Sequence, residues 1–275
     1  MRRICLAVVP ALLVLTSCIQ PDGSPRGDAS PSPPASSPSE ASVDLPDPVS
    51  TCSLLVGSAE VGLTEQQAIT ATDLAADALD AGTTPRELVA AMSRLPGVPL
   101  NGARLNGARL NGTAAARALL GYDGPALSCL YGRVVLRDEP LGPTGLTPRA
   151  ERLRREIRRS FGDVAMGGFA SGGVSLGHGD NSSHYDGRAI DIFFRPYTDP
   201  VEARHGWVLS QWLVAHAERL RLLSVIYRDR IWTVWASFAG WRIYRHPGGH
   251  TTDPVLRHLD HVHTAVIGAL HRDDG

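Results

Sequence analysis

The sequence predicts an α+β protein, in which a small and mostly helical unit precedes a region that mixes helices with strands. Helix signals dominate residues 51–131, where Ala-rich segments follow Thr64 and Thr84. Strand signals come later, in short runs of β-branched and aromatic residues. The chain has 275 residues, which is enough for one or two domains with their own hydrophobic cores.

Residues 51–131 are expected to form a small helical domain. Thr64 with a Gln three residues later forms a capping-box pattern, and Thr84 is followed by Pro and then by Glu at the same spacing. Residues 132–146 are rich in Pro and Gly, which predicts a connector to the next domain.

Residues 147–270 are expected to form the second domain. Thr147-Pro148 predicts the start of an amphipathic helix that runs to about Ser160. Residues 225–227 and 231–235 alternate in the manner of two paired strands. The tryptophans in these strands are interpreted as packing residues.

The N-terminus predicts an exported lipoprotein. Residues 1–18 combine a short basic start with an apolar run that is too short to span a bilayer and suits a signal peptide. The run ends at Cys18 in a segment that resembles a lipobox, in which the cysteine receives lipid. The alternative is an ordinary secretory signal in which Cys18 has no role.

Residues 19–50 consist mainly of Pro, Ser, Ala and Asp and contain no aromatic residue. Such a segment cannot bury enough apolar surface to offset its ordering entropy, so we expect a disordered tether. Together with Cys18, it predicts an extracytoplasmic protein that is attached to the cell membrane through lipid.

Two cysteines, Cys52 and Cys129, remain beyond the signal segment. An even number of cysteines in an oxidising compartment favours a disulfide, which would join the beginning of the helical unit to its end. The alternative is two buried free thiols. Because the formal net charge is only −1, no nucleic-acid partner is expected. The sequence does not indicate an oligomeric state.

The first chemical signal is Asp191, which lies between Ile190 and Ile192 in a segment that suits a buried strand. A carboxylate there is costly unless it is paired or binds a cation. His184 is the nearest candidate in sequence, because Gly187 allows a turn that brings the two side chains together.

The second signal is His261-x-His263, which fits a short strand with both imidazoles on one face. Two imidazoles and a carboxylate are a common ligand set of catalytic zinc, with a fourth position left for water. The residue types therefore favour a Zn²⁺ site formed by His184, Asp191 and a histidine of the His-x-His pair. The alternative is a polar cluster that binds no metal.

These residues form a pattern, Ser-x-His-x-x-Gly-x-Ala-x-Asp at residues 182–191 followed by Asp-x-x-His at residues 260–263. The pattern resembles that of the zinc D-alanyl-D-alanine carboxypeptidase and dipeptidase family, which includes VanY-type carboxypeptidases and shares its fold with hedgehog signalling domains. The resemblance implies a central antiparallel sheet and His184, Asp191 and His263 as zinc ligands.

The resemblance also implies residue roles. Asp260 stands where the family has its general base, although many members have Glu there. In a regular strand Asp260 would face away from His263, so His261 is the rival base or oxyanion stabiliser. Ser182 matches a serine beside the substrate. The segment Gly167–Ala170 lacks the family's substrate-binding Arg, for which Arg188, Arg242 and Arg245 are the candidate replacements.

The predicted function is a membrane-anchored zinc metallopeptidase that hydrolyses peptidoglycan stem peptides. The alternative is a zinc-containing module of the same fold that binds wall peptides or a protein without cutting them. His178 is interpreted as part of a Gly-rich loop. Six other histidines lack metal-ligand spacing and are expected at the surface: His205, His216, His246, His250, His258 and His271.

Overall fold

The computed structural model describes residues 51–94, 104–105, 108–109, 111–132, 134–179 and 181–269. The signal segment, Cys18 and the expected tether lie outside these residues, as does His271. The described residues belong to one compact unit, Asp47–Gly275. None of the helices described is long and apolar enough to cross a membrane.

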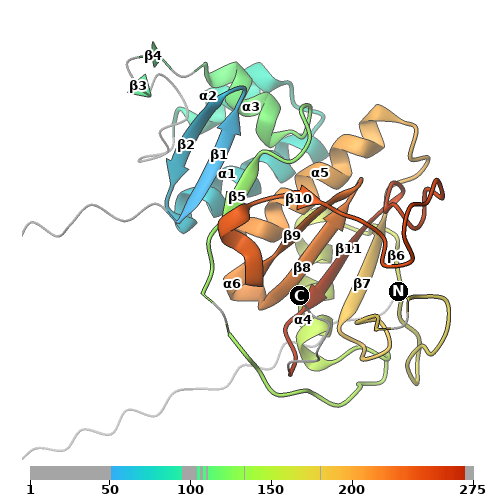
Figure 1. Cartoon of the computed structure of the whole chain (residues 1–275). Helices are drawn as coiled ribbons and strands as arrows, with labels where there is room; N and C mark the ends of the chain where they lie inside the picture. Colours follow the sequence, from blue (N-terminus) through green and yellow to red (C-terminus); the bar gives the residue numbers. More distant parts are fainter. Residues whose placement is uncertain are drawn as a thin grey trace, which may run out of the picture. The chain divides into compact units, whose positions relative to one another are not determined.

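The fold is α+β, as predicted (Figure 1). The N-terminal part contains the helices α1 (Glu65–Asp80), α2 (Pro85–Met92) and α3 (Gly112–Leu119). It also contains the antiparallel sheet β2-β1-β5, formed by β1 (Cys52–Val56), β2 (Ala59–Leu63) and β5 (Leu127–Cys129), and the short pair β3 (Arg104–Leu105) and β4 (Ala108–Arg109). The three-stranded sheet was not expected from the sequence.

Both predicted capping boxes are present. The Thr64 hydroxyl accepts a hydrogen bond from the Gln67 backbone N–H, and the Gln67 side chain accepts one from the Thr64 backbone N–H. Thr84 and Glu87 make the same pair of bonds at the start of α2. The reciprocal bonds satisfy backbone donors that a helix end leaves without partners.

The predicted disulfide between Cys52 and Cys129 is present, and the two residues are register partners on β1 and β5. The bond therefore joins the first strand of the N-terminal part to its last. Residues 134–146 follow without helix or strand.

The C-terminal part is built on a six-stranded antiparallel sheet in the order β10-β9-β8-β11-β7-β6. Helices α4 and α5 lie on one face of this sheet (Figure 1). The strands are β6 (Met166–Gly167), β7 (Ala189–Phe193), β8 (Leu222–Tyr227), β9 (Arg230–Thr233), β10 (Arg242–Ile243) and β11 (His261–Val266). The helices are α4 (Pro148–Phe161), α5 (Pro200–Ala215), α6 (Ala217–Leu220) and the 3-10 turn η1 (Val234–Ala239).

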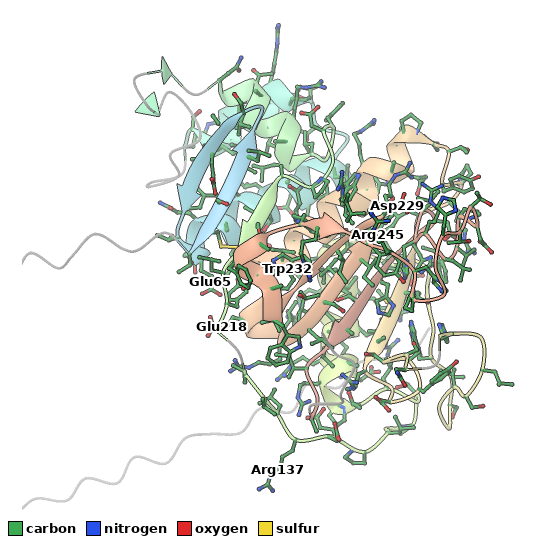
Figure 2. All side chains as sticks on the ribbon, in the orientation of Figure 1. Glu65, Arg137, Glu218, Asp229, Trp232 and Arg245 are labelled. Atoms are coloured by element: carbon green, nitrogen blue, oxygen red, sulfur yellow. A yellow bond between two sulfur atoms is a disulfide. The ribbon has the colours of Figure 1, made fainter. Side chains whose placement is uncertain are left out.

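The predicted strand pair around residue 228 is present, because Val225 and Ile226 of β8 pair with Trp232 and Ile231 of β9. The second strand is shorter than predicted, since it ends at Thr233 and residues 234–235 belong to η1. Trp232 is fully buried within this sheet (Figure 2). Trp212 of α5 is also fully buried and makes an edge contact with Phe161. Trp232 thus packs in the core, as the sequence indicated, and Trp212 packs there as well.

Helix α5 connects the two parts of the compact unit through the buried side chain of Gln211. Its amide oxygen accepts hydrogen bonds from the backbone N–H groups of Ala126 and Leu127, and its amide nitrogen donates to the carbonyls of Ala118 and Leu119. One buried side chain thus makes hydrogen bonds with four backbone groups from two segments of the N-terminal part.

Candidate metal centre and adjoining histidines

The centre is built on the two adjacent strands β7 and β11. Asp191 and His263 are register partners in this antiparallel pair, so their side chains lie on the same face. Ile190 and Ile192, which flank Asp191, and Val262, which precedes His263, are fully buried. Strict alternation places the apolar residues on one face of the sheet and the polar residues on the other.

His184 reaches the same face from a turn that precedes β7. The backbone N–H of Gly187 donates to the carbonyl of His184, and Gly187 has a φ of +64°. A Cβ at residue 187 would collide with the backbone of Gly145. Only glycine meets both conditions, so Gly187 fixes the direction from which His184 approaches the strand.

Three donor atoms from these residues converge. His184 Nε2 lies 3.0 Å from His263 Nδ1 and 3.2 Å from Asp191 Oδ1, and His263 Nδ1 lies 3.1 Å from Asp191 Oδ1. Ligand atoms about 2.0–2.1 Å from a tetrahedral zinc are separated by about 3.3–3.4 Å. The triangle formed by the three atoms therefore fits one face of such a coordination sphere.

The hydrogen bond of His184 Nδ1 determines which nitrogen of the ring carries the proton. His184 Nδ1 lies 2.8 Å from the Gly168 carbonyl oxygen, which only accepts, so Nδ1 carries the proton. In the neutral ring Nε2 then presents a lone pair toward the Asp191 carboxylate. Two electron-pair donors at this distance repel each other unless a cation or a proton lies between them. The donor set fits a divalent metal ion, with His184 oriented by its outer hydrogen bond.

Gly168 itself is shaped for this contact. It has a φ of +80°, and a Cβ at this position would collide with the His184 ring and lie 3.0 Å from Asp191 Oδ2. The residue follows β6, whose Gly167 pairs with Asp191. Gly168 therefore brings a backbone acceptor closer to the histidine than any other residue would allow.

The electrostatics of the cluster favour an ionised carboxylate. Burial acts to raise the pKa of Asp191, but its close contacts with the His184 and His263 imidazoles outweigh burial and hold this pKa well below its usual range. Burial lowers the pKa of the His263 imidazole, which favours its neutral form. Anionic carboxylate and neutral imidazole are the states that bind a metal ion.

His261 and Asp260 lie at different distances from the converging donor atoms. His261 Nε2 lies 3.8 Å from Asp191 Oδ1, beside the converging donors. Asp260 instead accepts a hydrogen bond from His261 Nδ1 at 2.8 Å and contacts Arg195 NH2 at 2.7 Å. His261 thus lies between Asp260 and the cluster.

The ion pair with Arg195 fixes the Asp260 carboxylate. Burial acts to raise the pKa of Asp260, whereas the hydrogen bonds from His261 and Arg195 lower it, and the net shift is downward. The Arg195 guanidinium also lies 4.2 Å from the centre of the Phe193 ring, although half of the Arg195 side chain is exposed. An ionised Asp260 holds the His261 proton on Nδ1 and leaves a lone pair on Nε2.

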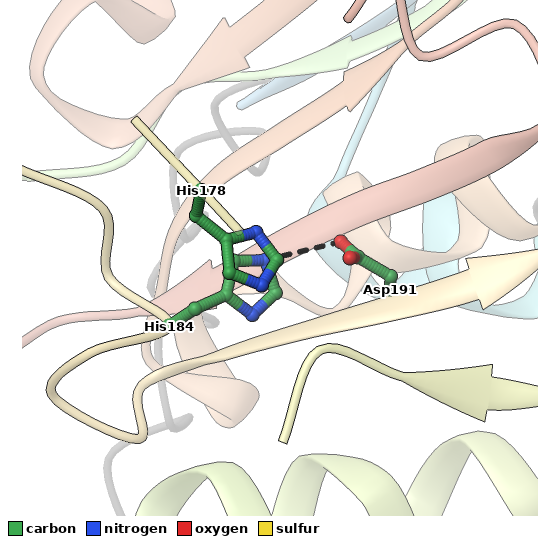
Figure 3. Close-up of side chains that lie close together, drawn as sticks. All are labelled: His178, His184 and Asp191. Carbon is green, nitrogen blue, oxygen red and sulfur yellow. Dashed lines mark ion pairs between the residues drawn. The ribbon is translucent and has the colours of Figure 1, made fainter. Parts of the chain in front are cut away.

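His178 lies over the cluster. Its ring stacks on the His184 ring, with 3.9 Å between the ring centres and an interplanar angle of 20° (Figure 3). The dashed line in the same figure marks the ion pair of His184 with Asp191. His178, His184 and Asp191 each offer a ligand atom within 4.8 Å of the others. An imidazole binds a metal in the plane of its ring, so nearly parallel rings do not point at one ion. In this arrangement His178 covers His184, and a turn of its side chain is required for it to become a ligand.

The backbone of His178 is held by Tyr185, the residue after His184. The Tyr185 hydroxyl accepts a hydrogen bond from the His178 N–H at 3.1 Å and donates one to the His178 carbonyl at 2.6 Å. Burial and the nearby His184 imidazole lower the pKa of His178. The sequence had placed His178 only in a Gly-rich loop.

A fifth imidazole, His258, was missed because it precedes β11 in a turn and has no ligand spacing. Its ring centre lies 4.8 Å from that of His261 and 5.6 Å from that of His263. Burial, followed by the His263 and His261 imidazoles, holds the pKa of His258 well below its usual value. His258 is half-buried beside the cluster and is not the exposed residue that the sequence indicated.

The expectation of a surface position is also wrong for His216, which is buried beside α5. Its Nδ1 donates to the Trp212 carbonyl at 2.9 Å, and its Nε2 lies 3.5 Å from Asp73 of α1. The side chain contributes to the core between α1 and α5. Nothing in the local sequence pattern marked this contact, because Asp73 lies in a distant helix.

The two predicted substrate residues lie in different surroundings. Ser182 is half-buried, and its hydroxyl accepts a hydrogen bond from the backbone N–H of His184. Arg188 is buried and donates to the Asp186 carboxylate and the Val266 carbonyl. Arg188 lies directly before β7, and these hydrogen bonds hold its guanidinium at Asp186 and Val266. Ser182 thus contacts the backbone of a proposed metal ligand, whereas Arg188 contacts Asp186 and Val266.

A cavity of about 560 Å³ opens beside Asp260. Its volume is in the range of sites for small ligands or short peptide segments. Its walls are mostly apolar, with Arg195 and Asp260 as the charged groups; the lining residues are Arg195, Pro196, Tyr197, Pro254, Val255 and Asp260.

Comparison with known proteins adds one similarity. Residues 142–255 match the family model described as the VldE C-terminal domain. The match covers about two-fifths of the chain, includes His184 and Asp191, and ends before Asp260 and His263. No curated protein and no solved structure matched the chain.

Proposed function

We propose that the protein is a zinc-dependent peptidase that cleaves peptidoglycan stem peptides while anchored to the cell membrane by lipid on Cys18. The observation that carries the proposal is the convergence of His184 Nε2, Asp191 Oδ1 and His263 Nδ1 within 3.0–3.2 Å of one another. The resemblance to the zinc carboxypeptidase and dipeptidase family supplies the class of bond. The proposed location at the membrane rests on the lipobox-like segment that ends at Cys18 and on the expected tether of residues 19–50.

His184, Asp191 and His263 would hold the metal, which they fit in donor type and in separation. A zinc ion held by two imidazoles and a carboxylate polarises a carbonyl group and lowers the pKa of water. Gly168 holds the ring of His184 in the tautomer that this binding requires.

His261 is the proposed general base. With its proton held on Nδ1 by Asp260, the Nε2 lone pair takes a proton from the water that attacks the scissile carbonyl carbon. As the new C–O bond forms and the C–N bond breaks, the same nitrogen returns the proton to the leaving amine. Asp260 acts through His261 as a positioning residue, and Arg195 fixes Asp260 in turn.

The assignment of Asp260 as the base itself is less favoured by the geometry. Both carboxylate oxygens are engaged, Oδ1 by His261 and Oδ2 by Arg195. The cavity beside Asp260 and Arg195 is the proposed place for part of the substrate, because its apolar walls suit small aliphatic side chains. Ser182 remains a candidate substrate contact.

The alternative is a module of the same fold that binds wall peptides without cutting them. The engaged carboxylate of Asp260 favours it, since no free acidic base faces the cluster from that residue. Both functions require the metal ion, but only the peptidase releases cleavage products.

The test is incubation of the purified, zinc-loaded protein with defined stem peptides, followed by mass spectrometry of the products. We expect cleavage that 1,10-phenanthroline stops and added zinc restores. Peptide binding without any cleavage would establish the binding module instead. Cleavage that is insensitive to metal removal would rule out the proposed mechanism.

A further inference from the structure

The backbone at His258 has an unusual conformation. Its φ is +52°, in the left-handed region that side-chain-bearing residues adopt infrequently. Hydrogen bonds hold the turn on both sides, from Arg228 N–H to the His258 carbonyl at 2.9 Å and from His258 N–H to the Val255 carbonyl at 2.9 Å. A conformation of this kind persists where the surrounding structure enforces it, often at functional sites.

The side chain of His258 is unusual in a second way. Its Nδ1 is buried and has no hydrogen-bond partner among the described residues. A buried polar nitrogen without a partner costs about 1–3 kcal/mol. Native proteins satisfy nearly all such atoms, and an exception calls for an explanation such as a catalytic role.

The third observation is the position of the ring. It packs between the Tyr244 ring, at 4.9 Å, and the rings of His261 and His263, at 4.8 and 5.6 Å. The unsatisfied side chain is therefore adjacent to the proposed general base and to a proposed metal ligand. A peptide that enters the site can bring a carbonyl oxygen, which is the acceptor that an imidazole N–H lacks here.

We propose that His258 is a further catalytic residue, whose Nδ1–H donates a hydrogen bond to the carbonyl oxygen of the peptide bond being cleaved. The inference rests on the proposed function and adds a role that the His-x-His motif does not contain. As the attacking water adds to the carbonyl carbon, the oxygen gains negative charge and the hydrogen bond strengthens. A donor that is already positioned stabilises this charge without reorganising.

The backbone conformation of His258 and the position of its Nδ1 determine which substitutions test the proposal. His258→Gly keeps the left-handed conformation and removes the side chain. His258→Asn tolerates that conformation and retains an amide donor at the δ position. His250→Gly is the matched control, because His250 is an exposed histidine in the same segment.

In the zinc-loaded protein we expect His258→Gly to lose about 10²–10³-fold in kcat/KM, mainly in kcat, as when one oxyanion donor is removed. His258→Asn should recover most of this loss, and His250→Gly should match the parent protein. The metal content should be equal in all four proteins. Equal losses in the Gly and Asn variants, together with lower thermal stability in both, would indicate a structural role and overturn the inference.

A second readout does not require peptide cleavage. In the cobalt-loaded protein, acetohydroxamate binding is followed by the visible absorption spectrum, and we expect about tenfold weaker binding in His258→Gly and recovery in His258→Asn. Unchanged acetohydroxamate affinity in His258→Gly would overturn this inference alone. A parent protein that binds neither zinc nor cobalt would overturn the proposed function and this inference with it.

Discussion

His263 and Asp191 are register partners on adjacent antiparallel strands, and 3.1 Å separates His263 Nδ1 from Asp191 Oδ1. The backbone hydrogen bonds of β7 and β11 fix this distance before any ligand binds. A site built on strands is more precise than one built on loops, because strand backbones are held on both sides. Only His184 comes from a turn, and Gly168 and Gly187 control its approach.

The first prediction concerns Gly168. We predict that Gly168→Ala weakens metal binding by about 10–100-fold, because the added methyl collides with the His184 ring and displaces a ligand from its outer acceptor. The measurement is zinc affinity by competition with a chromogenic chelator.

Gly172→Ala is the control for backbone strain alone. Gly172 has a φ of +86°, close to that of Gly168, and nothing lies within 4 Å of its added Cβ. This variant should lose about 1 kcal/mol of stability and no metal affinity. Equal effects of the two substitutions on zinc binding would show that Gly168 does not position His184.

The second prediction separates the general base from its positioning residue. His261→Ala should lower kcat by about 10²–10⁴-fold with zinc still bound. Asp260→Ala should cause a smaller loss, and the double variant should resemble His261→Ala, because residues that act as a unit are not additive. Independent, additive losses would instead identify Asp260 as a base in its own right. The measurement is the steady-state kinetics of the three variants.

The third prediction concerns pH and stability. Burial lowers the pKa of His216, against the opposing influence of the Trp212 carbonyl and the Asp73 carboxylate. Arg219 acts in the same direction as burial, and Glu156 opposes it. Because the unfolded chain binds this proton more tightly, the stability linked to His216 is complete above about pH 6.5 and is lost as the pH falls below that value.

Urea unfolding at pH 7.5 and pH 5.5 measures this linkage. One proton contributes at most about 1.4 kcal/mol per pH unit to the free energy of unfolding. His216→Gln should lose stability less steeply than the parent as the pH falls, whereas the control His205→Gln on α5 should follow the parent. An identical pH dependence in His216→Gln and the parent would contradict the assignment.

The fourth prediction concerns the disulfide between Cys52 and Cys129. It closes a segment with a sequence separation of 77 residues, for which chain entropy indicates about 4.5 kcal/mol of stabilisation. Replacing both cysteines with Ala should lower the free energy of unfolding by an amount of this order, and the parent in reductant should match the variant. A variant as stable as the oxidised parent would show that the crosslink does not stabilise the fold.

Some of the site could be anticipated from the sequence. An ionisable residue between two isoleucines marks Asp191 as a buried group that needs a partner, and the period of two places His261 and His263 on one face. The same period explains why Asp260 turns away from the cluster and contacts Arg195. These inferences hold because strand geometry is local.

Other parts could not be anticipated, because they depend on contacts between distant segments. His258 lies in a turn outside the periodic pattern, so only the folded chain shows its ring beside His261. The acceptor for His184 is the backbone of Gly168, which no side-chain motif reveals. The hairpin β1–β2 is local and was missed because the strong helix signal after Thr64 dominated this segment; only the pairing of β1 with β5 joins distant residues.

The most direct test of the account is the zinc content of the purified protein after equilibration with zinc and removal of excess, measured by inductively coupled plasma mass spectrometry. The account predicts one zinc per chain in the parent and in the exposed control His250→Ala, and little or none in His263→Ala. A parent protein without zinc, or a His263→Ala variant that retains it fully, would contradict the account.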